Sequence, residues 1–145
     1  MKVSQNFKIQ EFVGQEIYEK RGGERSLQLI DNRIIKIAQH IRNILGTIIV
    51  INNWHLGGVY KESGLRDPSM KHYSPTSQHT FGRAIDIKSP GISSLTIYNK
   101  LIQNTTILSN LGVTTLEDIN FTPGWVHIDC RDWKIEKEEF YIVKP

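Results

Sequence analysis

The stretch Trp125-Val126-His127-Ile128-Asp129 alternates aliphatic side chains with aromatic or polar ones. Successive side chains of a β-strand point to opposite faces of the sheet. Val126 and Ile128 would therefore share one face and enter a core. Trp125, His127 and Asp129 would share the other face. The stretch thus predicts a half-buried strand that presents His127 to a cleft.

A second stretch, Ser77-Gln78-His79-Thr80-Phe81-Gly82-Arg83-Ala84-Ile85-Asp86, carries a further histidine and a carboxylate. Gly82 permits a tight or left-handed backbone between His79 and Asp86. Ala84 and Ile85 read as the start of a buried strand. We therefore expect a turn at Gly82 that brings His79 and Asp86 together.

His79, Asp86 and His127 form a set of ligands that suits zinc. Structural zinc sites usually have four protein ligands, often thiolates, whereas a catalytic zinc keeps one position open for water. Cys130 is the single cysteine, which excludes a cysteine-rich structural site. Three ligands therefore point to a catalytic metal, although manganese, iron or nickel could occupy the same set in vitro.

The pattern SxHxxGxAxD followed by WVH resembles the zinc D-alanyl-D-alanine carboxypeptidases and L-alanyl-D-glutamate endopeptidases of bacteria and bacteriophages. Upstream, Asn6–Phe12 and the segment Ser63-Gly64-Leu65-Arg66-Asp67-Pro68 are similar to further segments of that family, so the resemblance covers about residues 6–133. It implies that His79, Asp86 and His127 hold Zn²⁺. It also implies that Arg66 contacts the substrate near the scissile bond.

The general base is less directly indicated. Several branches of that family place an acidic residue or a histidine just before the second histidine ligand, where this chain has Gly124 and Trp125. A metal-bound water still needs a group that takes its proton. Asp129 is the first candidate, because it shares a strand face with His127 at a Cα separation of roughly 6.5 Å.

Two alternatives to Asp129 as the base stay open. Glu117 and Asp118 precede the turn Thr122-Pro123-Gly124, which could fold one of them back over the metal. Other branches of the resembling family carry an acidic residue about ten positions before the histidine of WVH, which favours Glu117 or Asp118. Asp129 could then orient a histidine ligand or pair with Arg131.

The elements predict an α+β fold: helices packed on one face of a small, mainly antiparallel sheet, with the zinc site in a cleft on the sheet. Helices are expected at Asp31–Leu45, capped by Asp31 and ended by Gly46, and at Ser93–Gln103. The expected strands are Thr47–Asn52, Ala84–Lys88, Glu117–Phe121, Trp125–Asp129 and Phe140–Val143. Residues 1–145 would form one domain with an N-terminal arm at 1–28, a core at 29–145 and a flexible loop at Lys20–Glu24.

Composition limits the partners. The net charge is +3 and the pI is near 9.0, but the basic residues are spread along the chain rather than gathered in a run. The composition therefore does not indicate nucleic-acid binding. No stretch has the roughly twenty apolar residues of a membrane span. The start Met1–Asn6 lacks the apolar region of a signal peptide.

The sequence therefore predicts a zinc metallopeptidase that cleaves peptidoglycan stem peptides, as a D,D-carboxypeptidase or an L,D-endopeptidase. The missing export signal fits a phage-encoded lysis enzyme in the host cytoplasm, or a virion-associated enzyme with other phage particle proteins as partners. The alternative is a catalytically impaired metal-binding module of a phage particle, structural or wall-binding. Gly124 favours that alternative, because no acid stands there.

Overall fold

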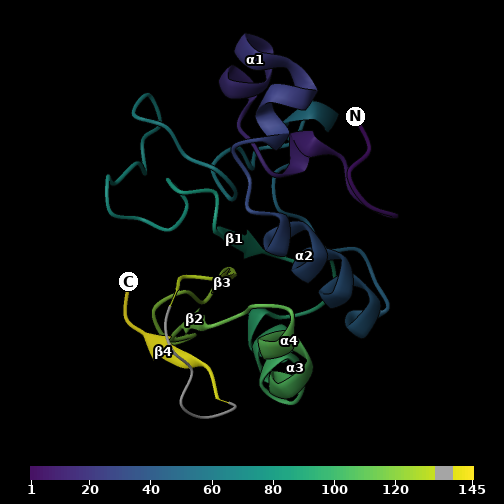
Figure 1. The fold of residues 1–145 in the computed structure, drawn as a ribbon. Helices are drawn as coiled ribbons and strands as arrows, with labels where there is room; N and C mark the ends of the chain where they lie inside the picture. Colours follow the sequence, from purple (N-terminus) through teal and green to yellow (C-terminus); the bar gives the residue numbers. More distant parts are fainter. Residues whose placement is uncertain (133–138) are drawn as a thin grey trace.

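The computed structural model describes residues 1–132 and 139–145 (Figure 1). Over these residues the fold is α+β, with a four-stranded mixed sheet. The short 3₁₀ helices are η1 (Ile9–Glu11) and η2 (Trp54–Leu56). The α-helices are α1 (Gln15–Leu27), α2 (Asn32–Leu45), α3 (Ser94–Ile102) and α4 (Thr105–Asn110). The strands are β1 (Ala84–Ile87), β2 (Thr115–Glu117), β3 (Val126–Asp129) and β4 (Tyr141–Val143).

The sheet has the strand order β1-β3-β2-β4. β3 pairs antiparallel with both β1 and β2, whereas β4 joins β2 in parallel. In this register Asp86 lies opposite His127, and Ile85 lies opposite Ile128. The register therefore separates an apolar face from a polar face. The polar face carries Asp86, Glu117, His127 and Asp129.

The apolar face is fully buried: Ile85, Ile87, Leu116, Val126 and Ile128 are all 0% exposed. α3 packs on β3, and α2 packs on α3. α2 contributes Ile34, Ile37 and Ile41 to the same core. In Figure 1, α2, α3 and α4 lie beside the strands, while α1 lies apart and packs on η1. The helices thus leave the polar face available for a site.

The two predicted helices are confirmed together with their caps. The Asp31 carboxylate accepts a hydrogen bond from the Arg33 amide, and Gly46 ends α2 in the left-handed conformation with φ 64°. Ser93 caps α3 by accepting from the Thr96 amide at 3.1 Å. Helix α4 was not expected from the sequence.

Two predicted strands are wrong. Thr47–Asn52 forms only one bridge, Val50 to Lys88; its β-branched residues reflect burial of Ile49 and Ile51 in the core rather than a paired strand. The strand expected at Glu117–Phe121 lies earlier, at Thr115–Glu117. It ends because the Asp118 carboxylate accepts the Asn120 amide at 3.0 Å, which turns the chain.

The N-terminal residues belong to the body of the domain. Phe7, Ile9 and Phe12 are at most 2% exposed and enter the same core as α2. The flexible loop expected at Lys20–Glu24 is wrong as well. These residues lie within α1, which is helical on both sides of a kink at Gly22, where φ is 73°. Among the described residues, no helix combines the length and apolar character needed to cross a membrane.

Candidate metal centre

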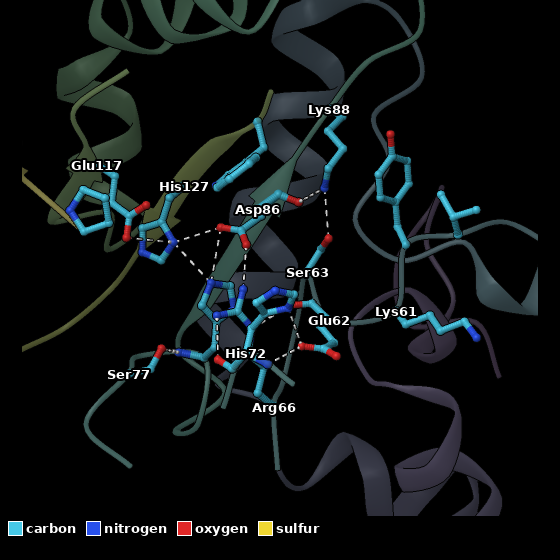
Figure 2. Close-up of a pocket in the computed structure, with 15 residues that line it drawn as sticks. Lys61, Glu62, Ser63, Arg66, His72, Ser77, Asp86, Lys88, Glu117 and His127 are labelled. Atoms are coloured by element: carbon cyan, nitrogen blue, oxygen red, sulfur yellow. Dashed lines mark hydrogen bonds and ion pairs between the residues drawn. The ribbon is translucent and has the colours of Figure 1, made fainter. Parts of the chain in front are cut away.

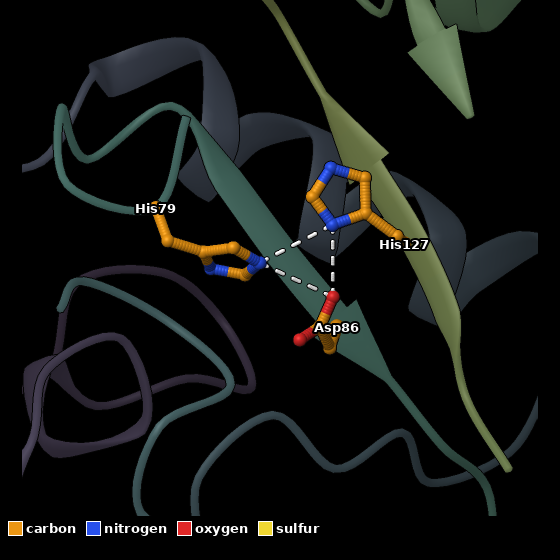
Figure 3. A group of neighbouring side chains, drawn as sticks. All are labelled: His79, Asp86 and His127. Atoms are coloured by element: carbon orange, nitrogen blue, oxygen red, sulfur yellow. Dashed lines mark hydrogen bonds and ion pairs between the residues drawn. The ribbon is translucent and has the colours of Figure 1, made fainter. Parts of the chain in front are cut away.

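His79, Asp86 and His127 converge on one point (Figure 3). Nε2 of His79 lies 3.2 Å from both Oδ1 of Asp86 and Nδ1 of His127. Nδ1 of His127 lies 2.9 Å from Oδ1 of Asp86. His79 comes from the loop before β1, Asp86 from β1 and His127 from β3. All three are buried, with 2%, 7% and 4% of their surface exposed.

In each histidine ring, the nitrogen that faces away from the cluster makes a hydrogen bond to another group. Nδ1 of His79 lies 2.8 Å from the Gly64 carbonyl oxygen, and because a carbonyl only accepts, this nitrogen carries a proton and donates. Nε2 of His127 lies 3.1 Å from Oδ2 of Asp129 and donates to that carboxylate. His79 Nε2 and His127 Nδ1 are therefore the ring nitrogens that face the Asp86 carboxylate, and in the neutral form of each ring they carry the lone pair.

Three lone pairs at this separation repel one another unless a cation lies between them. Tetrahedral zinc with bonds of about 2.0–2.1 Å separates its ligand atoms by roughly 3.3 Å. The observed separations of 2.9–3.2 Å are close to that value. Two imidazoles and one carboxylate are also a donor set that zinc accepts. The residues present therefore fit a divalent metal ion.

The pKa shifts of the three side chains also indicate that the cluster is stabilised by a positive charge. Burial alone would raise the pKa of Asp86, but the charge of His79 and the hydrogen bonds from both imidazoles lower it. Burial would lower the pKa of His127, yet its hydrogen bonds to Asp129 and Asp86 raise it to about 9. Burial lowers the pKa of His79. The cluster thus holds an ionised carboxylate and attracts one cation, either a proton or a metal.

Two glycines set the position of His79. Gly82 has φ 66°, and a Cβ there would lie 2.1 Å from the Leu29 carbonyl oxygen, so only glycine fits this turn. A Cβ on Gly64 would lie 2.2 Å from the Phe12 carbonyl oxygen. Gly64 can therefore approach the N-terminal segment closely while its own carbonyl fixes the His79 ring. The expected turn at Gly82 is confirmed.

Asp129 lies behind His127 rather than in the space between the ligands. Its side chain is 0% exposed and bonds Nε2 of His127. Its other contacts are to Arg131, whose Nε donates at 2.8 Å and whose terminal nitrogen makes a second ion pair. Burial would raise the pKa of Asp129, but the bonds from Arg131 and His127 lower it. This contact fixes the orientation of the His127 ring and keeps a proton on Nε2, so that Nδ1 is the nitrogen that can bind a metal.

Glu117 and Asp118 point in different directions. Oε1 of Glu117 lies 3.9 Å from Nδ1 of His127, on the polar face and beside the ligand atoms. Burial raises the pKa of Glu117. Asp118 instead accepts two hydrogen bonds from Asn120 and acts electrostatically on Tyr98 of α3, on the helix side of the sheet. The structure therefore brings Glu117 to the cluster and leaves Asp118 away from it.

Arg66 contacts the cluster through Asp86. Its terminal nitrogen lies 2.9 Å from Oδ2 of Asp86, the oxygen that does not face the histidines. Its Nε donates to the Glu62 carbonyl oxygen at 2.7 Å. Arg66 thus fixes the orientation of Asp86 and also lines the space in front of the ligands.

A cleft of about 510 Å³ opens over the three candidate ligands (Figure 2). The loop between η2 and β1 contributes Tyr60, Glu62 and Ser63 to the lining of the cleft, and Trp125 lines it as well. Lys88 also lines the cleft, and burial lowers its pKa to about 8 against the raising effect of Asp86. Sequence reasoning missed Lys88. The signal was available, because Lys88 follows Asp86 by two residues and shares its side of the chain.

Comparison of the chain with protein-family models, curated proteins and solved structures finds no match. Function therefore has to be inferred from the residues of the chain itself.

Proposed function

We propose that this protein is a zinc-dependent peptidase that cleaves peptidoglycan stem peptides. The observation that carries the proposal is the convergence of His79 Nε2, Asp86 Oδ1 and His127 Nδ1 within 2.9–3.2 Å at the floor of an open cleft. A site with three protein ligands and an accessible fourth side is typical of catalytic rather than structural zinc.

The metal would supply one kind of chemistry. Zinc bound by these residues acts as a Lewis acid, which polarises a carbonyl group and lowers the pKa of water toward neutrality.

The remaining steps fall to side chains of the cleft. We assign Glu117 as the general base, because it is the carboxylate beside the ligand atoms that is not itself a ligand. It takes a proton from the attacking water and returns it to the nitrogen of the leaving amine. Asp129 is a positioning residue, since both of its oxygens are engaged by His127 and Arg131. Arg66 holds Asp86 and lies within reach of a substrate carbonyl.

The stem-peptide substrate rests on the resemblance of the Ser77–Asp86 and Trp125–His127 motifs to zinc peptidases of the bacterial cell wall. An action on the cell wall as a phage lysis or virion-associated enzyme is part of the same proposal. A position of Glu117 beside the ligands favours an active enzyme over the metal-binding structural module, because it supplies the acid that is missing at Gly124.

The test is chemical. Purified protein loaded with zinc is incubated with peptidoglycan of several wall chemotypes, with and without a chelator, and the released peptides are identified by mass spectrometry. We expect a new amino or carboxyl terminus within the stem peptide that disappears with the chelator and returns with added zinc. Zinc binding without any chelator-sensitive product would replace the peptidase proposal by the binding-module alternative.

A further inference from the structure

Lys88 places an ammonium group in the cleft beside the metal-binding cluster. It follows the end of β1, and its backbone pairs with Val50. Its Nζ donates to the Ser63 hydroxyl at 2.9 Å and lies 3.5 Å from the Asp86 carbonyl oxygen. Figure 2 shows the ammonium group between these two oxygens. The side chain also lies over the Tyr60 ring, with Nζ 4.4 Å from its centroid.

The partners of this ammonium are all neutral. Within residues 1–132 and 139–145, no carboxylate lies within ion-pair distance of Lys88 Nζ. A partly buried ammonium loses hydration, and an anion compensates that loss better than a hydroxyl or a ring face does. Arg66, the other buried cation of the cleft, is already paired with Asp86. Among the described residues that line the cleft, Lys88 is therefore a partly buried cation without a carboxylate partner.

We infer that Lys88, together with Ser63, binds a carboxylate of the substrate on the residue that follows the scissile bond. Lys88 Nζ lies 3.5 Å from the backbone carbonyl oxygen of Asp86, whose side chain is one of the candidate ligands, and Lys88 lines the same cleft as all three of them. A carboxylate on the residue next to the cleaved bond would therefore lie in the same cleft as this ammonium group. This inference rests on the proposed peptidase function and adds a substrate requirement to it.

The requirement is consistent with the chemistry of the stem peptide. A carboxyl-terminal D-alanine carries a free α-carboxylate directly after the D-alanyl-D-alanine bond. A D-glutamate linked through its γ-carboxyl likewise carries a free α-carboxylate directly after the L-alanyl bond. Either bond would therefore present an anion to Lys88, whereas an ordinary internal peptide bond presents a neutral amide.

The experiment uses two pairs of synthetic stem peptides. One pair ends in D-alanyl-D-alanine as the free acid or as the amide. The other pair carries D-glutamate after L-alanine, with its α-carboxyl free or converted to the carboxamide. The zinc-loaded wild-type protein is compared with Lys88→Met, which keeps a long unbranched side chain and removes its charge. Lys100→Met on the exposed side of α3 is the control for the change in net charge.

For the bond that the enzyme cuts, we expect the wild type to prefer the free acid over the amide by about 10–100-fold in kcat/KM. Lys88→Met should lose this preference through a slower reaction of the acid, with the amide changed less than about threefold. Lys88→Arg should restore the preference, and Lys100→Met should leave it intact. A Lys88→Met variant that slows acid and amide equally would overturn the inference, since it would indicate a structural role.

Absence of cleavage would refute the peptidase proposal without deciding the role of Lys88. Calorimetric titration of the same four peptides into the zinc-loaded proteins then gives the answer. Binding of the acids that weakens at least tenfold in Lys88→Met would support the carboxylate subsite. Equal affinities in wild type and Lys88→Met would overturn it.

Discussion

Oε1 of Glu117 lies 3.9 Å from Nδ1 of His127, across the β2-β3 pair. The neighbouring Asp118 instead accepts a hydrogen bond from the Asn120 amide and stabilises a turn. Two adjacent carboxylates that the sequence leaves equivalent thus have separate surroundings, and the difference can be tested with matched variants.

Glu117→Gln should abolish turnover while leaving zinc bound. The amide keeps the size of the side chain but cannot accept the proton of the attacking water, and a positioned general base contributes about 10²–10⁴-fold to the rate. Turnover of stem peptides and the zinc content of the purified protein are the measurements. Asp118→Asn is the control and should keep both. Full activity in Glu117→Gln would remove Glu117 from the mechanism.

Asp129→Asn should weaken zinc binding rather than stop the reaction outright. Asp129 accepts a hydrogen bond from Nε2 of His127 at 3.1 Å. Loss of such a hydrogen-bond partner typically lowers the metal affinity of a histidine site by about 10–100-fold. Activity should recover as the zinc concentration rises in a metal titration. Glu117→Gln should not recover under the same conditions. An Asp129 variant that stays inactive at saturating zinc would instead indicate a proton-transfer role.

Zinc should stabilise the folded protein. At 100 times its dissociation constant, a ligand specific for the native state adds about 2.7 kcal/mol, which corresponds to roughly 8 °C in melting temperature for a domain of this size. The measurement is thermal unfolding with zinc and with a chelator. His79→Ala should melt at the same temperature in both conditions. His40→Ala, on α2 and away from the cluster, should respond like the wild type.

Gly64→Ala should damage the metal site without altering any ligand. The added Cβ would lie 2.2 Å from the Phe12 carbonyl oxygen, so the backbone must shift, and the Gly64 carbonyl that fixes His79 would shift with it. We expect a loss of about 1–3 kcal/mol in unfolding free energy and weaker zinc binding. Denaturant unfolding and zinc titration measure these. Gly124→Ala is the control, because a Cβ there meets no atom within 4 Å.

The sequence predicts those parts of the fold that depend on local chemistry. Asp31 and Gly46 mark the ends of α2 because capping and left-handed glycine act within a few residues. The alternation around His127 places Val126 and Ile128 in the core for a similarly local reason. Thr47–Asn52 is different, since its β-branched residues are buried without finding a partner strand. Pairing depends on distant residues, so propensity alone misplaces it.

In the candidate site, too, some residues can be predicted from local sequence and others depend on contacts between distant parts of the chain. The three candidate ligands can be found from the combined motif and its resemblance to a known family, and the structure brings all three together. The roles of Asp129 and Glu117 depend on which strand lies next to β3, and no local pattern contains that information. Lys88 escapes notice because a single lysine after a strand resembles an ordinary surface residue until Ser63 and Tyr60 are seen around it.

The close contact between Gly64 and Phe12 makes the beginning of the chain a mechanical support for His79, one of the three candidate metal ligands. The Leu65 amide bonds the Phe12 carbonyl oxygen at 2.8 Å, and Val13 forms a bridge with Leu65. Fraying of this segment would therefore loosen His79 from a distance. A protease cut near Val13 should release zinc before the sheet unfolds, so metal retention would report on the integrity of the amino-terminal segment.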